Sequence, residues 1–238
     1  MNKFWEFKAL GNAGELFLYG EISDTSWWGD EVTPAQFQRD LAALGDISTL
    51  DVYINSPGGD IFAGFALYNI LNRHLAAKTV HIDGLAASAA SVVAMAGDTI
   101  KMPANATMMI HNAWTYASGG AEDLRKTADE LDRINDQIAD IYAARTGKDK
   151  ADISDLMTAE TWMSGAEALD MGFVDELIEN KKVAACAGTE KWFALYKHAP
   201  EDKEPDNGGE IQPAADINTA LQEQRKKFRA MKLKFLEV

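Results

Sequence analysis

A serine, a histidine and an acid in this sequence have the side chains that catalysis by a nucleophilic hydroxyl requires. Ser88 stands in GLAASAAS, a run of small residues, and His111 ends the apolar run TMMIH. Glu160 stands beside an aromatic and an apolar stretch in AETWMSG. A histidine can take the proton of a serine hydroxyl, and a carboxylate can hold that histidine in the required tautomer. The three residue types therefore indicate nucleophilic catalysis.

Ser88 is expected at a junction between a strand and a helix. Residues 79–83 (TVHID) have a strand pattern ended by Gly84, and residues 86–96 favour a helix. A hydroxyl at the start of a helix lies near the positive end of its dipole, which favours a nucleophilic serine. Ser91 is expected to bond a backbone carbonyl four residues earlier and to be structural. From its surroundings alone, Ser88 could instead be a small residue that packs the helix.

Two further features could complete such a site. Among the four histidines, His111 is the best candidate base because it ends a buried strand, whereas His81 lies within a strand and fits a structural role. The turn NSPGG contains Gly58 and Gly59, which permit unusual backbone angles and close approach of a substrate. Such a turn can present backbone N–H groups to a developing oxyanion, although a glycine turn alone is weak evidence.

The elements that must position these residues alternate along the chain. Alternating strands and helices predict an α/β fold with a parallel sheet, in which reactive groups gather at the carboxyl ends of strands. Ser88, His111 and the NSPGG turn each follow such a strand. Strands are expected at 16–20, 49–54, 79–83 and 107–111, with helices at 34–44, 60–71 and 165–171.

A longer helix is expected at roughly 121–145. Its apolar positions, which include Leu124, Leu131 and Ile138, form a narrow stripe, and the other face is dense in charged residues. A narrow stripe suits packing against a partner helix, and packing on the helix's own domain is equally compatible with it.

The composition of the whole chain limits the classes of function. A chain of 238 residues, 47% hydrophobic, can form one sizeable α/β domain with a small appendage. The net charge of −14 argues against nucleic acid as a partner. No apolar run approaches about 18 residues and the N-terminus does not fit a signal peptide, so no membrane association is expected. The lone Cys186 excludes an intrachain disulfide and fits the cytoplasm.

Three parts are expected along the chain. Residues 1–197 form the main domain, 198–216 are an acidic linker rich in proline and glycine, and 217–238 are a basic, helical tail. The tail is expected to be solvated, or to dock on an acidic partner or on the acidic body of its own chain.

Four motifs together resemble the proteolytic subunit of the Clp protease. These are YINSPGGDIFAGFALYNIL, GLAASAASVVAMAG, MMIHNAW and MSGAEALDMGFVD, in matching order over roughly residues 15–180. The resemblance implies a ClpP/crotonase-like fold, with stacked parallel-sheet βαβ units and a long protruding handle helix at 121–145. It also implies serine endopeptidase chemistry that uses no cofactor and no metal, and homo-oligomeric rings that meet through the handle helix.

The resemblance also implies roles for individual residues. By motif position, Ser88 is the nucleophile, His111 is the base, and the backbone amides of Gly59 and Ala89 form the oxyanion hole. The family's aspartate falls at Glu160, whose side chain is one methylene longer.

Two residues are therefore candidates for the acid. A glutamate can still fix the imidazole tautomer, so Glu160 is the first choice and Asp155 the second.

Two departures from the housekeeping Clp subunit suggest a more specific role. Only about 15 residues precede LFLYG, and a linker with a basic tail follows the domain. Both features resemble the head maturation proteases of tailed phages and prophages, which cleave scaffold and capsid proteins without an ATPase. We therefore expect a prohead protease in the host cytoplasm or the assembling prohead. One alternative is an ATP-dependent Clp subunit that works with an AAA+ unfoldase, and another is a catalytically retired assembly factor. A crotonase acting on acyl-CoA is less compatible with the sequence, because it would not need Ser88 and His111 at these positions.

Overall fold

The fold is built around one twisted, mostly parallel sheet. The computed structural model describes residues 4–23, 34–178, 192 and 196–199, all of which belong to a unit spanning Met1–Pro200. The expected α/β class with a parallel sheet is confirmed. The strands are β1 (Trp5–Leu10), β2 (Ala13–Tyr19), β3 (Thr49–Ser56), β4 (Ala77–Ala87), β5 (Thr99–Pro103), β6 (Thr107–Ile110), β7 (Thr161–Ser164) and β8 (Glu176–Ile178).

Strand β4 is the branch point of the sheet. The strand order is β1-β2-β3-β4-β5-β8, and β6 also pairs with β4 and then with β7. The first part of β4 pairs with β5 at Thr79–His81, and its last part pairs with β6 at Leu85–Ala87. Among the strand pairs of the described residues, β1–β2 and β6–β7 are antiparallel and the others are parallel. The fork therefore brings the carboxyl ends of β3, β4 and β6 to one region.

The branch depends on an irregularity near Gly84. The sequence pattern predicted that the strand would end there, but β4 continues to Ala87. The register between β3 and β4 shifts after Ile54, and the Asn55 side-chain oxygen accepts the Leu85 N–H at 3.1 Å. A Cβ at Gly84 would lie 2.9 Å from that oxygen. Glycine is thus needed for the close approach of Asn55, and it does not terminate the strand.

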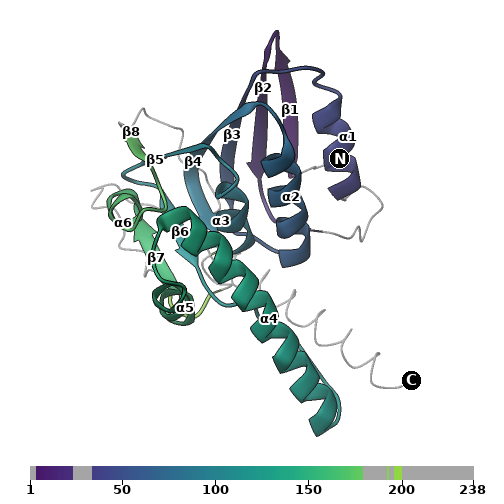
Figure 1. The fold of residues 1–238 in the computed structure, drawn as a ribbon, viewed down its shortest axis with the longest axis vertical. Helices are drawn as coiled ribbons and strands as arrows, with labels where there is room; N and C mark the ends of the chain where they lie inside the picture. The colour runs from purple at the N-terminus through teal and green to yellow at the C-terminus, as the bar shows by residue number, and fades with distance from the viewer. Residues whose placement is uncertain (1–3, 24–33, 179–191, 193–195, 200–238) are drawn as a thin grey trace, which may run out of the picture. The chain divides into compact units, whose positions relative to one another are not determined.

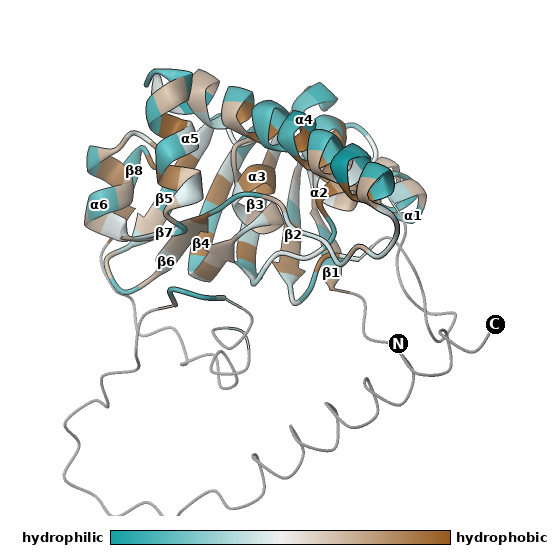
Figure 2. Cartoon of the chain, turned by 90° about the horizontal axis from the view of Figure 1, so that it is seen from below, coloured by the Kyte–Doolittle hydropathy of each residue, from teal (hydrophilic) through white to brown (hydrophobic). Residues whose placement is uncertain are grey.

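The helices gather on one side of the sheet (Figures 1 and 2). Alternate residues of β3 and β4, such as Val52, Ile54, Val80 and Ile82, are buried beneath them. The period-two pattern expected for a sheet covered by helices on one face is therefore present. The helices are α1 (Pro34–Ala42), α2 (Ile61–Arg73), α3 (Ala89–Ala94), α4 (Ala121–Thr146), α5 (Lys150–Thr158) and α6 (Gly165–Asp170).

Helix α4 is buried only along its C-terminal half. Its buried residues are Ile134, Ile138, Ala139 and Tyr142, whereas Leu124 is 44% exposed. The other end of α4 projects beyond the sheet (Figure 1). The protruding handle helix expected from the resemblance is therefore present. Its C-terminal half packs on its own domain, and its N-terminal half does not.

Several elements were not predicted from the sequence. Residues before LFLYG form β1, which pairs with β2 at the edge of the sheet, and β5, β7 and α5 were also missed. These are short elements or elements with one buried face only, for which the residue pattern is weak. Cys186, the tail 217–238 and all but the first two residues of the linker 198–216 lie outside the described residues, so the three-part division stays a prediction. No helix among the described residues is long and apolar enough to cross a membrane.

Candidate active site

Ser88 occupies a strained junction between β4 and α3. It is the N-cap residue of α3, with φ 54° and ψ −128°, a conformation that residues with a side chain rarely adopt. Its N–H donates to the Met109 carbonyl at 3.0 Å, and its own carbonyl accepts the Ser91 N–H at 3.0 Å. The neighbouring strand and the first turn of α3 therefore hold this backbone in place from both sides.

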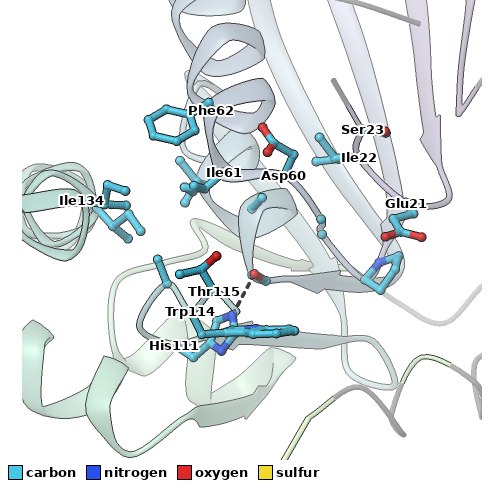
Figure 3. A pocket seen from close by; sticks show the side chains of 18 of the residues that line it. Glu21, Ile22, Ser23, Asp60, Ile61, Phe62, His111, Trp114, Thr115 and Ile134 are labelled. Carbon is cyan, nitrogen blue, oxygen red and sulfur yellow. Dashed lines mark hydrogen bonds between the residues drawn. The ribbon is translucent and has the colours of Figure 1, made fainter. Parts of the chain in front are cut away.

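The pairing of β4 with β6 brings the histidine to this serine. Ala87 lies opposite Met109 in the parallel register, so Ser88 follows one residue beyond this pair and His111 two residues beyond it. The His111 Nε2 atom lies 2.8 Å from the Ser88 Oγ atom, within hydrogen-bond distance (Figure 3). The structure thus places the expected nucleophile and base in contact.

The surroundings of His111 favour its neutral form. Burial lowers the pKa of His111 from its usual value of 6.5, and the negative charge of Glu160 acts in the opposite direction with a smaller effect. A neutral imidazole can accept the proton of Ser88, so this environment suits a general base.

A buried polar cluster supports the serine from behind. The Ser91 Oγ atom lies 2.6 Å from the Ser88 carbonyl, 2.9 Å from the Met109 carbonyl and 2.8 Å from the Tyr142 hydroxyl. Burial raises the pKa of Tyr142, which therefore stays protonated and can donate to Ser91 while Ser91 donates to a carbonyl. Ser91 therefore has the structural role that was expected. Its hydroxyl bonds the Ser88 carbonyl, which lies three residues earlier, whereas a carbonyl four residues earlier was expected. We call Ser91 and Tyr142 the Ser91–Tyr142 pair.

The NSPGG turn packs so closely against its neighbours that neither Gly58 nor Gly59 has room for a side chain. A Cβ at Gly58 would lie 2.7 Å from the Ser88 Cβ, and one at Gly59 would lie 2.0 Å from the Ile22 carbonyl oxygen. The Ser56 hydroxyl accepts the Gly58 N–H at 3.1 Å. Both glycines have positive φ, 90° and 141°, so glycine is required at both positions for conformation as well as for space.

The two amides expected at the oxyanion hole belong to this turn and to α3. Gly59 forms an isolated parallel bridge with Ile22 that uses the Gly58 carbonyl and the Asp60 N–H, not the N–H of Gly59 itself. Among the residues that the structure describes, neither the Gly59 N–H nor the Ala89 N–H has a hydrogen-bond acceptor. Both residues line the same cavity as Ser88, so both amides are available to a bound oxyanion.

Glu160 lies near His111 but is bonded elsewhere. It follows α5 with φ 52°, and its carboxylate accepts the His198 N–H at 2.7 Å, the Lys197 N–H at 3.3 Å and the Trp162 indole N–H at 3.3 Å. No hydrogen bond joins it to His111 within the described part of the chain. The structure therefore brings Glu160 close enough to act on the pKa of His111 and does not place it as its direct partner.

Asp155, the second choice for the acid, is further from this chemistry. It is exposed on α5 and lines a separate shallow pocket with Lys148 and Asp152. His81 bonds Asp51 at 2.9 Å and stacks on Tyr53, which agrees with a structural histidine.

Ser88 and His111 open into a cavity of about 540 Å³. One wall comes from the NSPGG turn and the start of α2, and the opposite wall comes from α4, including Ile134 (Figure 3). Within the described ranges, no group of three or more histidine, cysteine or acidic side chains could hold a metal ion.

Three residues of the site were missed by sequence reasoning. Tyr142 supports Ser91 from α4, Asn55 holds the β4 irregularity, and Tyr196 lines the cavity from a point far along the chain. The position of Tyr142 on the apolar stripe of the long helix is the one signal that could have indicated burial. Nothing in the spacing of Asn55 or Tyr196 indicated contact with the site.

Comparisons with known proteins identify similar chains. A family model described as Clp protease matches residues 5–181. A protein of Deinococcus radiodurans is 33% identical over 161 residues, which cover 63% of this chain and 79% of the relative. A protein of Porphyromonas gingivalis is 30% identical over 158 residues (64% and 71%), and one of Oltmannsiellopsis viridis is 38% identical over 132 residues (54% and 67%). All three are named ATP-dependent Clp protease proteolytic subunit.

Removing the Ser91 hydroxyl should destabilise the fold. In Ser91→Ala the buried Tyr142 hydroxyl loses its partner, so the free energy of unfolding should fall by about 1–3 kcal/mol. The double variant Ser91→Ala/Tyr142→Phe should lose less than the sum of the two single changes, because no unpaired hydroxyl remains. Urea denaturation measures all three.

Ser154→Ala provides a matched control, because Ser154 donates to a carbonyl of its own helix at 2.9 Å without a buried partner. It should change the free energy of unfolding by no more than about 0.5 kcal/mol. Additive losses in the double variant would contradict a coupled Ser91–Tyr142 pair.

His111 should titrate below its usual pKa. The folded state disfavours protonation of this residue, so NMR of the imidazole signals should give a midpoint below 6.5, with His111→Gln used to assign the signal. Because the unfolded chain binds this proton more readily, His111 should stabilise the fold less as pH falls below 6.5. A midpoint at or above 6.5 would show that Glu160 outweighs burial.

Proposed function

The chain belongs to the Clp protease family, and we propose that it cleaves peptide bonds with Ser88 as nucleophile and His111 as general base. Members of this family are serine endopeptidases. The observation that carries the residue assignment is the 2.8 Å contact between His111 Nε2 and Ser88 Oγ at the wall of an open cavity. Nucleophile and base are thus within direct proton-transfer distance.

The proposed reaction proceeds in two halves. Ser88 Oγ attacks the scissile carbonyl carbon while His111 Nε2 takes its proton, and His111 then protonates the leaving amine as the C–N bond breaks. A water molecule next gives a proton to His111 and attacks the resulting ester. Collapse of this second intermediate releases the acid, and Ser88 recovers its proton from His111.

The negative oxygen of both tetrahedral intermediates needs fixed donors. The Gly59 and Ala89 amides line the cavity on either side of Ser88 and have no acceptor among the described residues. We assign them to the oxyanion hole. The positive φ of Gly59 and the N-terminal position of Ala89 in α3 fix both amides before substrate binds, so little reorganisation is needed.

Glu160 is our candidate for the acid that supports His111. Its charge already acts to raise the pKa of His111, although its carboxylate bonds the N–H groups of Lys197 and His198 in this structure. A carboxylate near the imidazolium stabilises the charge that forms during proton transfer. Asp155 lies in a separate pocket and has no such effect on His111.

Oligomerisation through α4 completes the proposal. The N-terminal half of α4 carries exposed apolar residues, among them Leu124, and projects away from the sheet. A second copy of the chain could bury this stripe in the way that partner helices do. We propose that homo-oligomeric rings form through this helix.

Two biological roles are compatible with this chemistry, and they differ in the need for an ATPase. The names of the three relatives favour a proteolytic subunit of an ATP-dependent protease. In the sequence resemblance, the partner that uses ATP is an AAA+ unfoldase. Cleavage of scaffold and capsid proteins by a phage-type prohead protease without an ATPase is the second hypothesis. It rests on the sequence resemblance described above, and none of the three relatives is named as a head maturation protease.

Substitution at Ser88 tests the chemistry directly. Ser88→Ala should abolish both labelling by a fluorophosphonate and hydrolysis of a peptide substrate, because the attacking oxygen is lost. Glu160→Gln should lower the rate by about 10²-fold or more, whereas Asp155→Asn should leave it near the wild-type rate. Labelling elsewhere in Ser88→Ala would contradict the nucleophile assignment, and an unlabelled wild-type chain with an accessible site would favour a retired assembly factor.

Adding an unfoldase distinguishes the two roles. If the ATPase role is correct, a folded protein substrate should be degraded only when a bacterial Clp unfoldase and ATP are supplied, because a folded chain cannot enter a closed ring. A prohead protease should instead cleave co-expressed capsid or scaffold protein without either. The Ser88→Ala chain is the control in both assays.

A further inference from the structure

A segment made of the described residues Trp192 and 196–198 packs beside the catalytic residues. Trp192 and Tyr196 contact a small hydrophobic cluster of Leu85, Ala87 and Met109, with Trp162 at its side. This cluster is separate from the main core and lies on the ends of β4 and β6, the two strands that lead into Ser88 and His111. The segment is therefore anchored where the nucleophile and the base meet.

Tyr196 extends from this segment into the catalytic cavity. Its hydroxyl donates to the Pro57 carbonyl of the NSPGG turn, and its ring meets the His111 ring edge-on at 5.4 Å between centroids. A second edge contact, also at 5.4 Å, joins it to Trp162. Burial raises the pKa of Tyr196, while a hydrogen bond with the Ser88 side chain acts in the opposite direction. The Tyr196 side chain therefore contacts His111 through its ring and Ser88 through its hydroxyl.

The same segment also engages Glu160. The backbone N–H groups of Lys197 and His198 donate to the two carboxylate oxygens, at 3.3 Å and 2.7 Å. These bonds use the charge that the proposed mechanism needs beside His111. One short stretch thus places an aromatic side chain in the cavity wall beside Ser88 and His111 and binds the supporting acid with its main chain.

We propose that residues 196–198 are an intramolecular inhibitor of the active site, seated in a subsite for an aromatic side chain followed by two backbone N–H donors. This inference rests on the proposed function, because it assigns an occupant to that same site. Aromatic contacts and backbone hydrogen bonds together are the means by which a groove recognises an extended peptide. External peptide ligands of the same kind, with an aromatic residue before the bonded amides, should compete for this subsite.

Removing the tyrosine should open the site. In the full-length chain, Tyr196→Ala should raise the rate of fluorophosphonate labelling at Ser88 by about tenfold, because a larger fraction of molecules becomes competent. Tyr196→Phe keeps the ring and loses the bond to Pro57, so we expect a smaller rise of about threefold. The midpoint of the pH dependence of labelling should also move upward in Tyr196→Ala, since His111 becomes less buried.

Tyr116→Ala is the matched control. Tyr116 is 76% exposed and does not line the catalytic cavity, so the same change of residue should leave the labelling rate unaltered. Equal labelling of wild type, Tyr196→Ala and Tyr196→Phe would overturn the inhibitor proposal and leave the proposed function intact. No labelling in any of the chains would instead overturn the proposed function, and the inhibitor proposal with it.

A peptide supplied in trans tests the subsite by itself. The decapeptide KWFALYKHAP, residues 191–200, should slow the labelling of Tyr196→Ala back towards the wild-type rate. The same peptide with alanine in place of Tyr196 should have no effect. Failure of the tyrosine peptide to compete would overturn the proposal, and so would its cleavage, which would make the segment a substrate.

Discussion

The parallel pairing of β4 with β6 is the constraint on which the site depends. It places Ala87 opposite Met109, so that Ser88 and His111 leave the sheet side by side and meet at 2.8 Å. This pairing is possible only because β4 leaves β5 after His81 and continues beyond Gly84 to a second partner. A strand that ended at Gly84 could not present Ser88 to His111.

The strained backbone of Ser88 shows how the surrounding structure supports this geometry. A φ of 54° at a serine costs on the order of 1–3 kcal/mol and persists only where neighbouring contacts impose it. Here the contacts come from β6 through the Met109 carbonyl, from the Ser91–Tyr142 pair, and from the close packing of Gly58. Because Tyr142 belongs to α4, the helix that projects beyond the sheet also supports Ser88, the proposed nucleophile.

The proposed triad is complete in composition but not in hydrogen bonding. His111 contacts Ser88, whereas Glu160 gives its oxygens to the backbone of Lys197 and His198. Burial lowers the pKa of His111, and the charge of Glu160 opposes this shift without a hydrogen bond between the two side chains. The ring contact with His111 and the hydrogen bonds to Glu160 both come from residues 196–198.

The sequence by itself determined the α/β class, the long helix, and the candidates Ser88, His111 and Gly59, because strand alternation, helix periodicity and turn glycines are local patterns. It also indicated that Ser91 is structural. It could not show the fork of β4, the burial of Tyr142 against Ser91, or the partners of Glu160. Those contacts join residues far apart in the chain, such as Ser91 and Tyr142, which are 51 positions apart. No local pattern encodes such distances, so only the tertiary structure decided which side chains meet at the site.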